Sequence, residues 1–148
     1  MSLGLYLHIP YCFSKCRYCD FYSAPGQRGV PRAYVDALLR ELSRFSPDAP
    51  LRPDTLYFGG GTPSLLDPAD AARLIAAAQP LPGAEITLEA NPETVTEDSL
   101  RAFREAGVNR ISFGVQSARD SQLKTLGRPH TAKQARAAFA LSLIHISE

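Results

Sequence analysis

Residues 3–19 read LGLYLHIPYCFSKCRYC, an apolar segment that runs directly into a group of cysteines. The apolar part, Leu3–Ile9, is predicted to be a strand that is closed by Pro10. The cysteines then follow on the loop that leaves the carboxyl end of this strand. The sequence therefore predicts a strand whose carboxyl end leads into a cysteine-containing loop.

Cys12, Cys16 and Cys19 are the only three cysteines of the chain. An odd, tightly clustered set is a poor disulfide framework and indicates a metal or cluster site in a reducing compartment. The spacing Cys-x3-Cys-x2-Cys allows three thiolates to hold three irons of a [4Fe–4S] cluster and to leave one iron open. An open iron can bind a small chelating ligand, such as the amino and carboxylate groups of S-adenosylmethionine (SAM).

Three other interpretations of the cysteines stay open at this point. Structural zinc prefers four ligands and Cys-x2-Cys pairs, so it would need His8 or His130 in addition. The thiols can also be buried without a ligand. A lipoprotein cysteine at Cys12 would need a basic leader, and the segment before it has none.

The rest of the chain alternates between helical and strand patterns. Further strands are predicted at Thr55–Phe58, Glu85–Ala90 and Arg110–Val115. Helices are predicted at Pro31–Ser46, from Pro68 to about Gln79 after the cap Asp67, from the cap Thr96 to Gly107, around Asp120–Leu126, and after the cap Thr131. In the first helix, an apolar stripe at helical spacing is expected to line one buried face: Tyr34, Leu38, Leu42 and Phe45.

This alternation of strands and helices predicts an α/β fold with a parallel sheet. Spacing alone leaves open whether the sheet is part of a barrel or an open, doubly wound sheet. The length of 148 residues suits one domain, and 45% hydrophobic with 21% charged residues is typical of a globular protein.

The charge balance of 16 basic against 15 acidic residues argues against a nucleic-acid partner. No segment has the length and hydrophobicity of a membrane span, and no signal peptide is recognised, so a cytoplasmic protein is expected.

Candidate site groups stand at the ends of the predicted strands. The run Gly59-Gly60-Gly61-Thr62-Pro63 follows the second strand, and it is either a ligand-contacting loop or only a tight turn. Glu89 ends the third strand and Gln116 the fourth. Since the carboxyl ends of parallel strands gather at one edge, these groups are expected near the cysteines.

Five stretches carry a resemblance to a known family. They are YLHIPYCFSKCRYCDFYS, FGGGTPSLL, ITLEANPETVT, VNRISFGVQS and LGRPHT, in this order and within about residues 3–140. They resemble the oxygen-independent coproporphyrinogen III oxidase family of radical SAM proteins, and particularly its HemW-type haem-chaperone branch. The resemblance implies a partial radical SAM (β/α)6 TIM-like barrel, of which this chain has roughly the first four βα units.

The resemblance also implies cofactors and contacts. Cys12, Cys16 and Cys19 match the [4Fe–4S] ligands, and eight positions match SAM contacts: Tyr6, Tyr18, Gly60, Gly61, Thr62, Glu89, Gln116 and Arg128. An acidic and an amide group suit the ammonium and ribose hydroxyls of SAM, whereas an arginine suits its carboxylate. Core packing is the alternative role for both tyrosines. His8 can line the site or be a core histidine, and Lys15 and Arg17 can offset thiolate charge or lie in solvent.

Two departures separate this sequence from the oxidases of the resembled family. Phe21 stands where the oxidase branch has another cysteine, and the first strand begins almost at Met1, without the N-terminal extension of the oxidases. Both favour a haem chaperone that binds haem in its full-length form and passes it to a haem-accepting protein. Radical decarboxylation of coproporphyrinogen III is the alternative.

The last eight residues, LSLIHISE at 141–148, differ in composition from the rest of the chain. One back-translation of this segment, CTG TCT CTT ATA CAC ATC TCC GAG, reads as the end of a transposase-based sequencing adapter. We therefore expect residues 1–140 to be the N-terminal part of a radical SAM core domain and residues 141–148 to be a non-native tail. A natural helix end is the alternative.

Overall fold

The computed structural model describes residues 2–45 and 50–145. Its strands are β1 (Gly4–Ile9), β2 (Thr55–Gly60), β3 (Glu85–Ala90) and β4 (Arg110–Phe113). Its helices are α1 (Arg32–Leu42), α2 (Pro68–Ala78), α3 (Glu97–Ala106), α4 (Asp120–Leu126) and α5 (Ala132–His145), with short 3₁₀ turns η1 (Pro63–Leu65) and η2 (Pro92–Thr94). The predicted alternation of strands and helices is confirmed.

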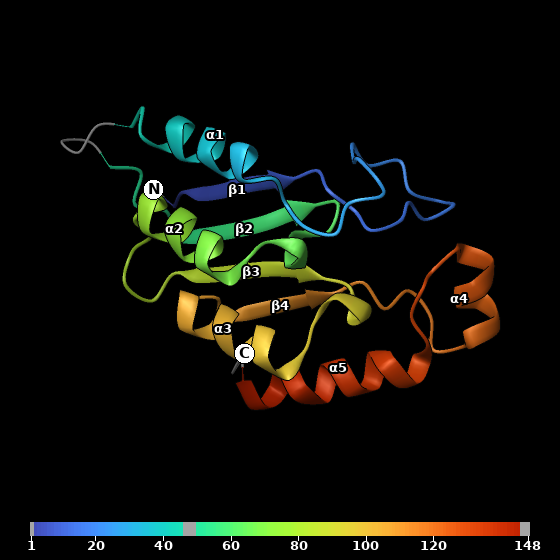
Figure 1. Ribbon diagram of the computed structural model, residues 1–148. Coiled ribbons are helices and arrows are strands. Elements are labelled where there is room, and N and C mark those ends of the chain that lie inside the picture. The colour runs from blue at the N-terminus through green and yellow to red at the C-terminus, as the bar shows by residue number, and fades with distance from the viewer. Residues whose placement is uncertain (1, 46–49, 146–148) are drawn as a thin grey trace.

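The four strands form one parallel sheet in the order β1-β2-β3-β4. Helices α1, α2 and α3 all cover the same face of this sheet, as Figure 1 shows. An open, doubly wound sheet reverses its strand order and carries helices on both faces. Sequential order with helices on one face is instead the arrangement of a barrel wall, so the alternative that spacing left open is decided in favour of the barrel.

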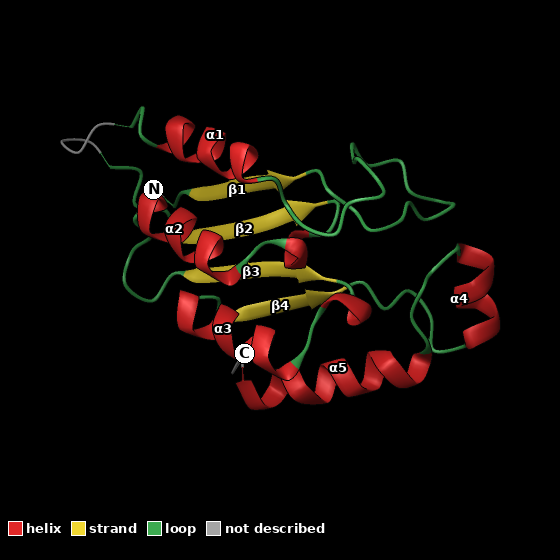
Figure 2. Ribbon diagram, viewed as in Figure 1, coloured by secondary structure: helices red, strands yellow, loops and turns green. Residues whose placement is uncertain are grey.

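The two faces of the sheet differ in chemistry because side chains alternate along each strand. The face under the helices is apolar, with Ile9, Leu56, Phe58 and Leu88 fully buried. The opposite face, which we call the polar face, presents Tyr6, His8, Tyr57, Thr87, Glu89, Arg110 and Ser112. Helices α1, α2 and α3 lie on the apolar side of the sheet and leave the polar face uncovered (Figure 2).

The predicted helix ends are built by local capping. The Asp67 side chain accepts a hydrogen bond from the Ala69 N–H at 2.8 Å, and Pro68 is the first residue of α2. Thr96 and Ser99 form a reciprocal capping box at the start of α3, and Gly107 ends it in a left-handed conformation, φ 113°.

One predicted helix differs from the structure. α1 ends at Leu42 because the next residues turn, with the Arg44 N–H bonded to Glu41 O and the Phe45 N–H to Leu42 O. Phe45 therefore leaves the helical stripe and is 52% exposed, so its predicted burial was wrong. Ser46, the predicted last residue, lies outside the described residues.

Two strand ends also differ from the prediction. β2 continues through the first two glycines of its run, whereas β4 stops at Phe113 instead of Val115. The Gly114 N–H still donates to Ala90 O of β3, but the backbone then turns, with the Val115 N–H bonded to Phe113 O at 3.0 Å. The Gly114 carbonyl oxygen accepts a hydrogen bond from Arg128 Nη2 at 2.6 Å.

Helix α5 crosses the predicted tail boundary without a break. Leu141 packs against the core and the Ser142 side chain is buried, whereas residues 146–148 of the predicted tail lie outside the described residues. The origin of the tail is not tested by these contacts and stays a prediction. Within residues 2–45 and 50–145, no helix combines the length and apolar character needed to cross a membrane.

Candidate functional site

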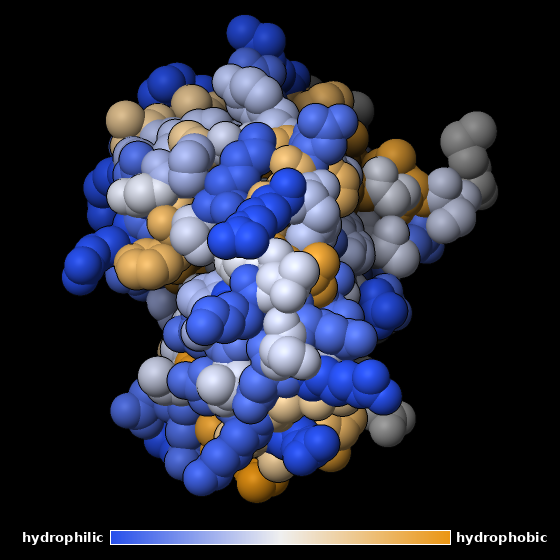
Figure 3. All heavy atoms as spheres, turned by 90° about the vertical axis from the view of Figure 1, so that its right-hand side faces the viewer, coloured by the Kyte–Doolittle hydropathy of each residue, from blue (hydrophilic) through white to orange (hydrophobic). Residues whose placement is uncertain are grey.

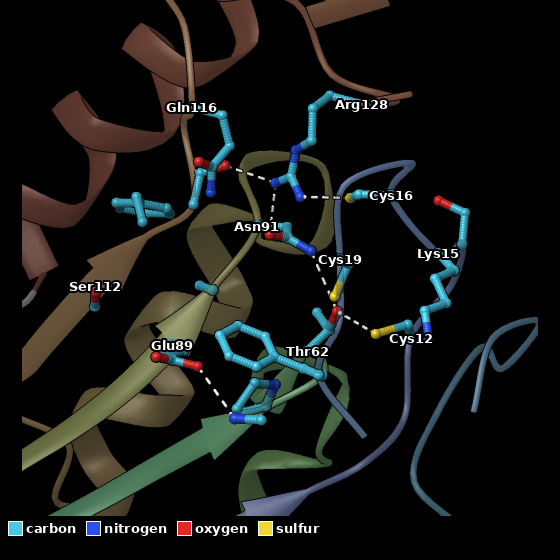
Figure 4. Close-up of a pocket in the computed structure, with 18 of the residues that line it drawn as sticks. Cys12, Lys15, Cys16, Cys19, Thr62, Glu89, Asn91, Ser112, Gln116 and Arg128 are labelled. Carbon is cyan, nitrogen blue, oxygen red and sulfur yellow. Dashed lines mark hydrogen bonds between the residues drawn. The ribbon is translucent and has the colours of Figure 1, made fainter. Parts of the chain in front are cut away.

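A cleft with an empty volume of about 850 Å³ opens at the carboxyl ends of the strands. Ten of the eleven predicted site residues line it: Cys12, Cys16, Tyr18, Cys19, Gly60, Gly61, Thr62, Glu89, Gln116 and Arg128. They come from the carboxyl ends of the strands and from the segments that follow them, as Figure 4 shows for seven of them. Figure 3 views this end of the molecule, where hydrophilic side chains predominate and hydrophobic ones form separate patches. The predicted convergence at one edge of the sheet is therefore present.

Two sets of backbone hydrogen bonds hold the cysteine loop. At its base, the Cys12 N–H donates to Ala24 O at 3.0 Å, and the Gln27 N–H donates to Cys12 O at 2.9 Å. At its far side, the Arg17 N–H donates to Leu126 O, the last residue of α4, at 3.2 Å. The first set thus ties the loop to the segment that leads back toward α1, and the second ties it to α4.

The three cysteines are free thiols that line the same cleft. Cys12 is buried, and Cys16 and Cys19 are half-buried. Among the described residues, no three His, Cys, Asp or Glu side chains are grouped so as to hold one metal ion. A [4Fe–4S] cluster asks for a different arrangement, since each thiolate binds its own iron at a separate corner. Three free thiols in the lining of one cleft supply the donor atoms that such a cluster needs.

Neither His8 nor His130 is placed to be the fourth ligand of a zinc ion held by the three cysteines. The His8 ring nitrogens face Tyr6 Oη at 3.1 Å and Tyr22 O at 3.1 Å. The His130 ring nitrogens face Glu93 Oε2 at 3.1 Å and Val115 O at 3.0 Å. Each histidine therefore has both nitrogens engaged away from the thiols.

The glycine run makes room for the first strand and for the cysteine loop. A Cβ on Gly59 would lie 2.7 Å from the Tyr6 ring, and one on Gly60 would lie 2.8 Å from the His8 ring. A Cβ on Gly61 would lie 2.8 Å from Cys12 Sγ and 2.7 Å from Tyr11 O. Gly60 also has φ 119°, a conformation that side chains disfavour. The run is therefore more than a tight turn, since it lets Cys12 approach β2.

Glu89 is fixed by two donors on its two oxygens. The Tyr57 hydroxyl donates to Oε1 at 2.7 Å, and the Gly60 N–H donates to Oε2 at 3.2 Å. Burial of Tyr57, together with its hydrogen bond to the Glu89 carboxylate, raises the pKa of the Tyr57 phenol. A carboxylate held this way lies ready for a cationic group in the cleft.

Arg128 is fixed by protein groups at both of its terminal nitrogens. Nη1 donates to Cys16 Sγ at 3.1 Å, and Nη2 donates to Asn91 Oδ1 at 2.7 Å and to Gly114 O at 2.6 Å. Its Nε is buried and has no hydrogen-bond partner among the described residues. The guanidinium of this cleft-lining arginine carries a permanent positive charge, which favours an anionic group in the cleft.

Asn91 lines the cleft and was not among the predicted site residues. Its Nδ2 donates to Thr62 Oγ1 at 3.2 Å, and Thr62 Oγ1 in turn donates to Cys12 Sγ at 3.6 Å. The signals in the sequence were its position directly after the third predicted strand and its place in the stretch ITLEANPETVT, which carries the family resemblance. Its role depends on Thr62 and Arg128, which lie 29 and 37 positions away in the sequence, so no local pattern includes them.

The remaining predicted residues differ in whether their side chains reach the cleft. Tyr18 and Gln116 lie in the lining, and Gln116 adopts a left-handed φ of 68° after β4. Tyr6 is the exception among the eleven, since it lies outside the lining and stacks on Tyr57 on the polar face, with ring centroids 6.0 Å apart. Of the two cations, Lys15 lines the cleft, whereas the guanidinium of Arg17 points at Thr125 O.

The chain is similar to several known proteins. Residues 6–143 match the family described as the Radical SAM superfamily. The Heme chaperone HemW of Escherichia coli is 47% identical over 146 residues, which cover 95% of this chain and 39% of that protein. Radical S-adenosyl methionine domain-containing protein 1, mitochondrial, of Bos taurus is 41% identical over 142 residues, or 89% of this chain and 31% of that protein.

Among solved structures, the coproporphyrinogen III oxidase HemN of E. coli, a radical SAM enzyme, has a TM-score of 0.82 and 29% identity. The match covers 99% of this chain and 35% of that one, so the four βα units correspond to part of a larger radical SAM fold. The predicted fold class is thereby confirmed. The chain spans about two fifths or less of the length of the two curated relatives named above.

Proposed function

The chain belongs to the radical SAM superfamily, and from this premise we propose that Cys12, Cys16 and Cys19 hold a [4Fe–4S] cluster with an iron open to SAM. The observation that carries the proposal is that all three free thiols line one cleft with the predicted SAM-binding groups. When bound, the cluster supplies one-electron reduction of the SAM sulfonium. The protein side chains supply binding, orientation and charge.

The cleft offers complementary groups for the parts of SAM. The fixed carboxylate of Glu89 suits the amino group, and the cleft-lining guanidinium of Arg128 suits the carboxylate. Gln116 at the mouth suits the ribose hydroxyls, and the half-exposed ring of Tyr18 suits the adenine. Gly60, Gly61 and Thr62 line the wall between these groups. Tyr6 acts from outside the lining, through its stacking on Tyr57.

We further propose a role in haem delivery, as in the haem-chaperone branch. Support comes from the 47% identity to the E. coli Heme chaperone HemW and from Phe21, which lines the cleft without offering a thiol. The protein would then bind haem and hand it to a haem-accepting protein, and the free thiols suit the reducing cytoplasm. Coproporphyrinogen III oxidation is the second candidate, favoured by the likeness to HemN.

Anaerobic iron–sulfur reconstitution followed by EPR tests the cluster. The reduced protein should give a [4Fe–4S] signal that changes when SAM is added, and Cys16→Ala should abolish it. Ser14→Ala is the matched control, because Ser14 lines the same cleft without being a proposed ligand, and it should keep the signal. A folded chain that takes up no iron, or binds zinc instead, would overturn the proposal.

Haem binding and decarboxylation separate the two candidate functions. The product of the complete reading frame should form a stable haem complex and release no carbon dioxide from coproporphyrinogen III under anaerobic conditions. Anaerobic decarboxylation would establish the oxidase instead.

A further inference from the structure

The carboxamide of Asn91 lies at the centre of a hydrogen-bond chain that ends on two of the three thiols (Figure 4). On one side, Asn91 Nδ2 donates to Thr62 Oγ1, which donates to Cys12 Sγ. On the other side, Asn91 Oδ1 accepts from Arg128 Nη2, while Nη1 of the same guanidinium donates to Cys16 Sγ. Asn91 therefore contacts both side chains, Thr62 and Arg128, that donate hydrogen bonds to the cysteine thiols.

The direction of each hydrogen bond depends on the amide. A hydroxyl has one proton to donate and accepts on its oxygen, so a neighbour that donates to this oxygen orients the Thr62 hydroxyl and leaves its proton for Cys12, whereas a neighbour that accepts competes for that proton. The Asn91 NH₂ is that donor at 3.2 Å, and the hydroxyl proton is left for the sulfur. The opposite end of the amide accepts from Arg128 at 2.7 Å and sets the plane of the guanidinium. Aspartate accepts but cannot donate, and leucine does neither.

The surroundings of Asn91 are shaped to keep this bridge. Its carbonyl oxygen accepts hydrogen bonds from the Thr94 N–H at 3.0 Å and the Thr94 hydroxyl at 2.8 Å, which fixes the start of η2. A Cβ on Gly114 would lie 2.8 Å from Asn91 Oδ1 and 3.2 Å from Arg128 Nη2. Only glycine at this position leaves room for the contact between amide and guanidinium. Thr62 is 2% exposed, so water does not compete for its hydroxyl.

We infer that Asn91 is a positioning residue that aims two hydrogen-bond donors at the cluster thiolates and thereby raises the reduction potential of the cluster. Donors to thiolate sulfur stabilise the more negative, reduced form, and hydrogen bonds to the sulfurs are among the features that set cluster potentials. The inference rests on the cluster proposed above. It adds that the protein tunes this cluster through a residue that touches neither iron nor the thiols.

The test is an EPR-monitored redox titration of the reconstituted chain. Asn91→Leu removes both ends of the bridge at similar volume and should lower the equilibrium constant for cluster reduction about tenfold, which is 59 mV for a one-electron couple. Thr62→Val should give a smaller shift in the same direction, because it removes only the donor to Cys12. Thr62→Ser restores the hydroxyl and should restore the potential.

A double-mutant cycle shows whether Asn91 acts through Thr62. Adding Thr62→Val to Asn91→Leu should shift the potential less than Thr62→Val does alone, because the shared path is already broken. Thr87→Val is the matched control: Thr87 is buried on β3 and bonds to Glu85 and Arg110, away from the thiols, so the potential should not move.

The outcomes separate this inference from the proposed function. A wild-type chain that folds but holds no cluster overturns both. Clusters of equal iron content and equal potential in wild type, Asn91→Leu and Thr62→Val overturn the inference alone. Additive shifts in the double variant also overturn it, because Asn91 would then act independently of Thr62.

Discussion

Tyr57 occupies the middle of the polar face, where its hydroxyl donates to Glu89 at 2.7 Å. Burial, and next the hydrogen bond to Glu89, hold its pKa above the usual tyrosine value of about 10. The folded protein therefore keeps this proton after the unfolded chain has lost it, so the stabilisation is complete below about pH 10 and is lost as the pH rises through the folded value.

Tyr57→Phe should accordingly lower the free energy of unfolding by about 1–2 kcal/mol at pH 8. The difference between wild type and variant should shrink at pH values above about 10. Urea unfolding at both pH values measures it. Tyr22→Phe is the control, since Tyr22 is 84% exposed and should cost nothing at either pH. A Tyr57→Phe cost that is the same on both sides of pH 10 would contradict the assignment.

Single residues also mark the limit of prediction from the sequence. Cys12 and Glu89 were found because each is a reactive or charged side chain close behind an apolar strand. Asn91 carries an ordinary polar side chain, and its importance depends on Thr62 and Arg128, which only the folded chain brings to it. Phe45 was assigned to the core on spacing, which cannot show that the helix has already ended.

At the scale of elements, the end of β2 and the cysteine loop form one unit, because Gly61 is the point at which they meet. Gly61→Ala places a Cβ 2.7 Å from Tyr11 O and 2.8 Å from Cys12 Sγ, so the loop must shift. We expect a marked loss of iron per chain after reconstitution, and a loss of about 1–3 kcal/mol in the free energy of unfolding from overpacking.

Gly29→Ala is the matched control for this substitution, because the nearest atom to its Cβ is Leu65 O at 3.9 Å. It should retain full iron uptake. Iron and sulfide analysis of both variants decides the matter, and full iron loading of Gly61→Ala would show that the close approach is not needed.

Elements were the scale at which sequence reasoning did best. Helix α2 begins at the proline of an Asp-Pro pair, and α3 runs from a threonine cap to a glycine cap. Local residue types therefore determine where both helices begin and where α3 ends. Neither the strand order nor the single helix-covered face is local, since both depend on how each crossover packs. For this reason the sequence left the barrel and the open sheet undecided.

For the whole molecule, the two edges of the sheet determine its behaviour in solution. Within residues 2–45 and 50–145, β1 pairs only with β2, and β4 pairs only with β3. Unpaired edges bind further strands. The apparent mass of this chain in light scattering should therefore rise with protein concentration. It should not fall in roughly 0.5 M salt, which screens charges but leaves backbone pairing intact.

A monomer at every concentration, with a sharp and reversible thermal transition, would contradict this expectation. Circular dichroism during heating and cooling provides that measurement on the same samples. Association with an unchanged far-ultraviolet spectrum would identify the edges, and not unfolding, as its cause.

The hydrogen bond from Arg128 to Cys16 spans 112 residues, and this separation has a consequence during synthesis on the ribosome. At about 5–20 residues per second, the arginine is added roughly 6–20 s after the cysteine. Over that interval β1, β2 and β3 can pair one after another, because each strand joins the one made just before it. The nascent thiols nevertheless lack their guanidinium donor until α4 has been made. Assembly of the finished metal environment therefore has to wait for a residue that is made well after the thiols.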